Sequence, residues 1–376
     1  MTAARMIELR GKSFPPPGLV CPGDLDRLSP IGGTRTHRVA VLVPMGGSAG
    51  LWGPSCISCA QLAISEVNAG GGIAGVALEP VFLNSDDSSV SDLEYELSGL
   101  VEDGVVAGIV GMSVSSVRQR LNKVLAGRVP HIYTPLYEGH EHTPNVYAIG
   151  ETPSDQLVPA IARLSDMLSA RRWALIGNDY VWPRASNAIA KPCIAAQGGT
   201  VTFEGYVPFG LEEPAWLVER IMRTEPDIVL ISLVGQDAVE FNRCFGDMGL
   251  DRSVFRFSTA IEENVLMATG AANTKRLFAA ASYFSALATE QNLSFKERYH
   301  AIHDGAAPAL NSLGQSMYEG ISFYAGLMRR RESDAPGPIS YASARGGVFY
   351  TNDRKVCPTY LARADGLQFS ILDRLS

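Results

Sequence analysis

Residues 173–187 read WALIGNDYVWPRASN and join a short apolar run to a corner and the start of a helix. The four apolar residues 173–176 are typical of a strand that is buried on both faces. Pro183 follows soon after, and proline suits the first turn of a helix because its missing N–H would have no partner there. The stretch therefore predicts a strand over 173–177, a sharp corner, and a helix over 184–196.

The corner carries an acid and two large aromatic residues, Asp179, Tyr180 and Trp182. In open α/β sheets, ligands bind beyond the carboxyl ends of the strands. We therefore expect Tyr180 and Trp182 to point into a binding cleft. Asp179 is expected to cap the following helix or to orient a neighbouring side chain rather than to touch a ligand.

The alternation of strand and helix extends on both sides of this stretch. Further strands are predicted at 39–43, 78–83, 106–110, 131–133, 200–206 and 227–232, and further helices at 53–68, 90–102, 156–170, 213–223 and 310–330. A second block of the pattern begins with helix 156–170, and the strands of both blocks are continuously apolar. This arrangement predicts an α/β fold with two doubly wound parallel-sheet lobes. After about residue 257 the pattern is less regular, and a final hairpin is predicted near 360–372.

Length, composition and charge exclude several classes of protein. At 376 residues the chain exceeds what one hydrophobic core usually supports, so two domains are expected. The apolar content of 46% and the charged content of 19% are ordinary for a globular protein. The net charge of −7 argues against direct nucleic-acid binding, which needs a basic face. No apolar run is long enough to span a membrane, so membrane insertion is not expected.

The N-terminal segment, residues 1–36, is rich in proline, glycine and arginine and shows no periodicity. It is interpreted as a surface arm or a disordered tail. Because it lacks the apolar core of a secretory signal, the prediction is a cytoplasmic protein. The alternative is a mature periplasmic protein whose leader is missing from this sequence.

Motifs for catalysis, cofactors and metals are weak. The glycines of 70–75 (GGGIAG) follow a helix and open a strand, the reverse of a dinucleotide-binding fingerprint, and indicate a helix stop and turn. Cys56 and Cys59 lie in a helical apolar pattern and are expected to be core residues rather than metal ligands. The loop 140–142 (HEH) is expected to be solvated. We therefore predict no enzyme activity, no cofactor and no metal.

Polar and aromatic residues cluster at the predicted carboxyl ends of several strands. The candidate ligand-binding residues found in this way are Ser113, Ser115, Tyr133, Tyr180, Trp182, Gln236 and Asp237. If the two lobes face each other, these residues would surround one cleft. Hydroxyl groups there can hydrogen-bond a small polar solute, while aromatic rings enclose its apolar part and exclude water.

Several segments resemble a known family. The longest are 68–75 (NAGGGIAG), 133–139 (YTPLYEG) and 177–187 (GNDYVWPRASN), with shorter matches at 258–263 and 281–285. Over about residues 37–372 the sequence resembles the type I periplasmic-binding-protein superfamily. The second and third segments resemble its amide- and urea-binding branch, which includes the AmiC-type cytoplasmic amide receptors and the urea and short-chain-amide binding components of ABC importers.

The resemblance implies two lobes joined by three crossovers near 151, 285 and 346 that close on a ligand. It implies a first lobe of 37–151 plus 286–345 and a second of 152–285 plus 346–376, the latter including the hairpin.

For the site, the resemblance adds Pro135 to the candidate residues and supports Ser113–Ser115, Tyr133, Tyr180 and Trp182. A tyrosine is common in the family at the position of Trp182, so the ligand is expected to be larger or flatter than acetamide. Gln236 and Asp237 resemble the importer components, where an acid can meet an amine or amide N–H of the ligand.

Three functions are weighed. The first is a non-catalytic cytoplasmic sensor of an amide-like or urea-like solute, whose closure signals to a regulatory protein such as an RNA-binding antiterminator; a homo-oligomer is expected. The second is the substrate-binding component of an ABC importer for urea, short-chain amides or amino acids, with a membrane permease as its partner. The third, an enzyme such as an amidase, would need a nucleophile and a base, and the sequence offers no such pair.

Overall fold

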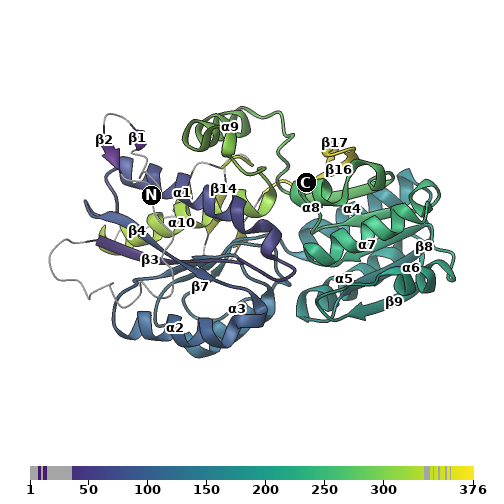
Figure 1. Ribbon diagram of the computed structural model, residues 1–376, viewed down its shortest axis with the longest axis horizontal. Coiled ribbons are helices and arrows are strands. Elements are labelled where there is room, and N and C mark those ends of the chain that lie inside the picture. The colour runs from purple at the N-terminus through teal and green to yellow at the C-terminus, as the bar shows by residue number, and fades with distance from the viewer. Residues whose placement is uncertain are drawn as a thin grey trace.

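The computed structural model describes residues 7–9, 12–14, 36–333, 339–341, 343–345, 348–351, 354–355 and 357–376. The chain forms two lobes that lie end to end, each built around its own β-sheet (Figure 1). The predicted arm, residues 1–36, lies mostly outside the described part. Within the arm, β1 (Ile7–Leu9) and β2 (Lys12–Phe14) form an antiparallel pair.

Lobe 1 contains a five-stranded parallel sheet. Its strands, in spatial order, are β4 (Ala77–Asn84), β3 (Thr36–Val43), β5 (Ile109–Gly111), β6 (His131–Tyr133) and β7 (Val146–Ala148). Its main helices are α1 (Gly53–Ala69), α2 (Val90–Glu102), α3 (Ser115–Leu125) and α10 (Ser312–Ser333). Figure 1 shows α1 and α10 on one side of the sheet and α2 and α3 on the other. The sheet is therefore covered on both faces, as its continuously apolar strands predict.

Lobe 2 repeats this arrangement and extends it. Its parallel strands are β9 (Thr200–Val207), β8 (Arg172–Asn178), β10 (Ile228–Ser232), β11 (Phe255–Ser258) and β12 (Leu277–Ala281), followed by the antiparallel hairpin β16 (Tyr360–Asp365) and β17 (Gln368–Arg374). Its helices are α4 (Pro153–Met167), α5 (Val181–Ala196), α6 (Ala215–Met222), α7 (Gln236–Asp247) and α8 (Glu263–Thr269). The predicted fold class and the final hairpin are confirmed.

Residues 173–176 of β8 show why the central strand sequences of lobe 2 are apolar at every position. Trp173 and Leu175 face a core shared with α4 and α5, whereas Ala174 and Ile176 face the other core. All four are at most 1% exposed. Successive side chains of a strand point to opposite faces, so a strand between two helix layers needs an apolar residue at every position.

Three passages connect the lobes. The chain leaves the first sheet after β7, returns after β12 to α9 (Glu290–His303) and α10, and passes back before β16. Before the last passage lie the short strands β13 (Ile339–Tyr341), β14 (Val348–Thr351) and β15 (Arg354–Lys355), and β13 packs on α10. The residue limits given above for the two lobes stay a prediction.

Two helices begin earlier than the sequence suggested. Helix α5 begins at Val181, so Pro183 is its third residue rather than its first. The first turn tolerates this position because the early N–H groups of a helix have no partner inside it. Helix α4 begins at Pro153. Thr152 and Asp155 form a capping box there, in which each side chain accepts the backbone N–H of the other residue.

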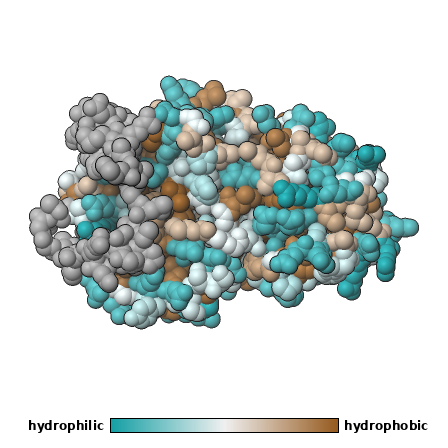
Figure 2. Space-filling model, viewed as in Figure 1, coloured by the Kyte–Doolittle hydropathy of each residue, from teal (hydrophilic) through white to brown (hydrophobic). Residues whose placement is uncertain are grey.

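The surface shows no broad apolar face on the side seen in Figure 2, where hydrophobic residues form small patches among hydrophilic ones. Among the described residues, no helix has the length and apolar character needed to cross a membrane.

Candidate functional site

A small cavity lies where the carboxyl ends of the two sheets meet. In lobe 1, β3 lies between β4 and β5, and in lobe 2, β8 lies between β9 and β10. In both sheets the chain thus adds its second strand on one side of the first strand and its third strand on the other side. Such a reversal of strand order opens a crevice at the carboxyl edge. The cavity has a volume of about 30 Å³ and is lined by Trp52, Met112, Ser113, Val114, Ser115, Tyr133, Pro135, Leu136, Tyr180, Trp182, Val234, Ala260 and Leu313. Six of the eight predicted site residues are thus brought together.

The lobe 1 wall is built by the loops that follow β5 and β6. The hydroxyl of Tyr133 donates to the carbonyl of Ser113 at 2.7 Å, which fixes the ring at the base of the cavity. Burial raises the pKa of Tyr133 to about 12, although the nearby Arg118 guanidinium opposes the shift, so the phenol stays neutral. The hydroxyl of Ser113 is buried without a partner. Ser115 opens α3, and the first N–H groups of a helix have no acceptor within it.

The lobe 2 wall is the aromatic corner. The ring of Tyr180 lies 6.4 Å from that of Trp182 and 5.1 Å from that of Phe209, measured between centroids. The indole of Trp182 is 2% exposed, and its Nε1–H is buried without a partner. This wall therefore offers apolar surface and one unused donor.

Asp179 stands outside this wall. Its carboxylate, half exposed, pairs with Arg184 at 2.7 Å, and no side chain caps α5. The guanidinium of Arg184 also lies 4.2 Å from the centre of the Tyr206 ring. Of the two roles predicted for Asp179, capping is wrong and the orientation of a neighbour is what the structure has.

The structure places Gln236 and Asp237 away from the cavity lining. The carboxylate of Asp237 accepts the side-chain N–H of Asn178 at 2.6 Å and the backbone N–H of Leu211 at 3.0 Å. It therefore ties the end of β8 and the segment after β9 to the start of α7. The side chain of Gln236 donates to Glu240 at 2.5 Å on the same helix. The side chains of Gln236 and Asp237 are thus bonded within lobe 2, and neither residue lines the cavity, although the backbone N–H of Asp237 donates to the carbonyl of the lining residue Val234 at 3.1 Å.

Several lining residues were missed from the sequence. Trp52 follows β3, a strand end that the sequence analysis did not use, and its Trp-Gly-Pro order marks the start of α1. Leu313 comes from α10, where its apolar side chain predicted only core packing. Val234 and Ala260 are apolar residues after β10 and β11 and carry no chemical signal.

The lining residues include no charged side chain. Arg118 is not among the lining residues, but its guanidinium lies 4.8 Å from the centre of the Tyr133 ring. Its charge is matched by Glu138 at 2.6 Å and by Glu141 at 2.9 Å. The second cavity near these residues, of about 570 Å³, is an open surface groove. It is lined by residues of α3, of the segment 138–143 and by Ala185 of α5, and none of them belongs to the predicted site.

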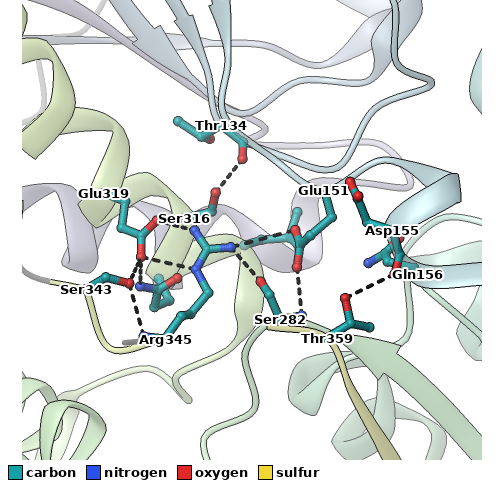
Figure 3. Close-up of polar contacts among 12 residues, drawn as sticks. Thr134, Glu151, Asp155, Gln156, Ser282, Ser316, Glu319, Ser343, Arg345 and Thr359 are labelled. Carbon is teal, nitrogen blue, oxygen red and sulfur yellow. Dashed lines mark hydrogen bonds and ion pairs between the residues drawn. The ribbon is translucent and has the colours of Figure 1, made fainter. Parts of the chain in front are cut away.

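A buried polar cluster stands at the passages between the lobes (Figure 3). Arg345 donates to the hydroxyl of Ser282 at 2.6 Å and makes a two-point ion pair with Glu319 on α10. Glu151 accepts the backbone N–H of Ser282 at 2.7 Å and lies 3.8 Å from Arg345. Each of the three passages thus contributes one residue. On α10, Ser316 also bonds to the carbonyl of Thr134, next to the cavity residues Tyr133 and Pro135.

The structure also places the cysteines and histidines that the sequence analysis considered. Cys56 and Cys59 are fully buried in α1, as expected for core residues. His140 and His142 are exposed, and Glu141 between them belongs to the Arg118 pairing. Within the described residues, no group of three or more histidine, cysteine, aspartate or glutamate side chains could hold a metal ion.

Comparisons with known proteins agree with this architecture. The family described as periplasmic binding protein matches residues 36–343. Among solved structures, the solute-binding protein of an ABC transporter from R. palustris, in complex with 4-hydroxybenzoate, is 17% identical over 90% of this chain and 96% of its own, with a TM-score of 0.78. An ABC transporter substrate-binding protein from Sphaerobacter thermophilus is 19% identical over 90% and 98%, with a TM-score of 0.76. A branched-chain amino acid ABC transporter ligand-binding protein from Burkholderia xenovorans is 15% identical over 90% and 95%, with a TM-score of 0.70.

The solved structures share the fold at low identity, and the family match spans most of the chain. The chain belongs to the periplasmic binding protein family.

Proposed function

We propose that the protein is the solute-binding component of an ABC importer. The family, together with the names of the related structures, supports this role over the cytoplasmic amide sensor. It also favours a periplasmic location over the predicted cytoplasmic one. The regulatory partner and the homo-oligomer stay predictions.

The proposed solute is small and flat, with an oxygen-bearing head group and no ammonium group. The observation that carries this proposal is the chemistry of the lining: four aromatic side chains, two unpartnered buried donors, and no carboxylate. The donors, the hydroxyl of Ser113 and the indole N–H of Trp182, would be matched by a carbonyl or carboxylate oxygen. An ammonium group would enter without a counter-charge and would lose its hydration, which costs several kcal/mol. Primary amides meet both conditions, whereas amino acids do not. A carboxylate carries the required oxygen, but it would depend on N–H and O–H donors alone, because no cation lines the cavity.

The size of the cavity implies movement of the walls. A volume of about 30 Å³ has space for roughly two water molecules. A solute with an aromatic ring therefore needs the lobes to separate before it enters and to close less tightly afterwards. A rotation at the three passages supplies that movement, and the solute stabilises the closed form through its contacts with both walls.

Calorimetric titration with matched solutes tests the proposal. Benzoate and benzamide compare a carboxylate with an amide on the same ring, and 3-phenylpropanoate and phenylalanine differ by one ammonium group. We expect at least one member of the first pair to bind, and phenylalanine to bind at least a hundredfold more weakly than 3-phenylpropanoate. Tighter binding of phenylalanine, or no binding of any of the four, would contradict the proposed solute class.

A further inference from the structure

A buried pair of side chains links the strand ends that build the lobe 2 wall of the cavity. Asn178 is the last residue of β8, and Asp237 is the second residue of α7. The side-chain N–H of Asn178 donates to the Asp237 carboxylate at 2.6 Å, and its side-chain oxygen accepts the backbone N–H of Val234 at 2.8 Å. Asn178 is fully buried and Asp237 is 2% exposed. The end of β8 is thus bonded, out of contact with water, to the segment that follows β10.

The same carboxylate holds the segment that follows β9. Its Oδ1 atom accepts the backbone N–H groups of Gly210 at 3.2 Å and Leu211 at 3.0 Å. Asp237 lies in the first turn of α7, where the N–H groups that have no partner in the helix favour a negative charge. Each of these bonds lies within lobe 2, so none of them depends on the position of one lobe relative to the other.

The segments joined in this way carry part of the surface that a solute would contact. Phe209 comes from the segment after β9, and its ring centre lies 5.1 Å from that of Tyr180, with 37° between the ring planes. The corner that bears Tyr180 is bonded to β9, since the backbone N–H of Asp179 donates to the carbonyl of Val207 at 2.7 Å. Tyr180 and Val234 line the cavity, and Phe209 packs on Tyr180 without being among the lining residues. The shape of this wall therefore depends on three segments of lobe 2.

We propose that Asn178 and Asp237 are positioning residues for solute binding, which set the shape of the lobe 2 wall although neither of them lines the cavity. With the pair in place, Phe209 is held against Tyr180 and Val234 is fixed at the cavity. Without it, the segment after β9 loses its acceptor, and a solute must order the wall as it binds, which lowers its affinity. The pair rests on the proposed function only in taking this cavity as the solute site.

An exchange of the two side chains first breaks the pair and then restores it. Asp237→Asn places an amide N–H group opposite that of Asn178, so one bond is lost whichever way the amide turns. Adding Asn178→Asp places a carboxylate opposite the new amide, which restores the bond between the two side chains and leaves acceptors for Val234 and Leu211. The exchange keeps the net charge and gives up the 3.5 Å bond from Asn178 to the carbonyl of Pro208.

Two measurements are made on each full-length variant. Calorimetric titration uses the tightest-binding of the four solutes named above, and amide hydrogen exchange follows the segments 179–182 and 208–211 without added solute. We expect Asp237→Asn to bind about tenfold more weakly and to exchange faster in both segments. The double variant is expected to recover slow exchange and to bind within about threefold of the wild-type affinity.

Thr274→Val is the matched control for a general loss of stability in lobe 2. The buried hydroxyl of Thr274 lies 3.1 Å from the carbonyl of Ala271 and 3.0 Å from that of Gly366, before β12 and therefore at the amino edge of the sheet. Its loss should lower the thermal midpoint and leave affinity and exchange in the two segments unchanged. An equal loss of affinity in Thr274→Val and Asp237→Asn would overturn the pair.

The remaining outcomes separate the pair from the proposed solute class. Equal affinity of wild type and Asp237→Asn, or a double variant that binds as weakly as the single one, would overturn the pair. If Asp237→Asn fails to fold, as circular dichroism would show, Phe209→Ala removes the ring from Tyr180 directly, and unchanged affinity there has the same meaning. If none of the four solutes binds the wild-type protein, the solute class fails, and unchanged exchange in 179–182 after Asp237→Asn would overturn the pair on its own.

Discussion

At the residue scale, the unpartnered hydroxyl of Ser113 separates binding from stability. Ser113→Ala removes a buried donor that the folded protein leaves unmatched, so the thermal midpoint of the solute-free protein should stay the same or rise slightly. A bound oxygen would lose a hydrogen bond, so affinity for the best solute of the titration panel should fall by about 1–2 kcal/mol. The control is Ser165→Ala, another buried and unpartnered hydroxyl, which lies on α4 away from the cavity lining. Equal affinity of wild type and Ser113→Ala would remove Ser113 from the site.

The same scale shows how far sequence reasoning reaches. Ser113, Tyr133 and Tyr180 could be assigned to the site because they follow parallel strands, and the carboxyl ends of such strands face the crevice. This rule needs no knowledge of contacts with distant parts of the chain. Asp237 obeys the same positional rule, yet its carboxylate is used by partners 26 and 59 residues away. Such partners are brought near only by the packing of lobe 2. Trp52 was missed because its indole N–H bonds to Glu262, which is 210 residues away in the sequence.

At the element scale, helix α10 packs closely on the sheet of lobe 1 because Gly320 has no side chain. A Cβ at Gly320 would lie 2.3 Å from the Thr134 methyl group and 2.9 Å from Val110. Helix propensity alone favours Gly320→Ala by about 1 kcal/mol, but overpacking costs about 1–3 kcal/mol. We therefore expect Gly320→Ala to lower the free energy of unfolding in urea. Gly99→Ala on α2, where a Cβ would meet nothing within 4 Å, should raise it by up to about 1 kcal/mol; stabilisation by both changes would disprove the close packing of α10.

Elements with continuous apolar runs or helical periodicity could be predicted, and β11 shows where that reasoning ends. Its four residues include Arg256, whose charge breaks the apolar pattern. The guanidinium is fully buried and donates to the Asn242 side chain at 2.7 Å and to the carbonyls of Asn273 and Lys275 at 2.9 and 2.7 Å. The strand is stable because a distant loop supplies acceptors for a buried cation. A pattern read along the sequence has no access to those acceptors.

At the scale of the whole molecule, two lobes could be predicted because the strand–helix alternation begins twice, but the cluster that joins them could not. Arg345, Glu319 and Glu151 come from separate segments and meet only after both lobes have formed (Figure 3). Each is less than a tenth exposed. Solute entry requires the lobes to move relative to one another, so the residues at their passages must stay bonded while the walls separate. The cluster suits this task because the guanidinium of Arg345 bonds both to Glu319 on α10 and to Ser282 at a passage.

Removal of Arg345 alone should therefore lower the free energy of unfolding far more than the combined removal of the charges of Arg345 and Glu319. Arg345→Met leaves the Glu319 carboxylate buried without its cation, which should lower the free energy of unfolding by about 3–5 kcal/mol in urea denaturation. Adding Glu319→Gln removes the stranded charge. Its amide oxygen can accept from Gln315 and its N–H can donate to the hydroxyl of Tyr341, so the double variant should recover much of that loss. Glu332→Gln, an exposed change at the far end of α10, is the matched control and should have no measurable effect. If the double variant is instead as unstable as the sum of the two single changes, Arg345 and Glu319 do not act as a pair, and the passages must be held together by their other bonds, among them that from Glu151 to Ser282.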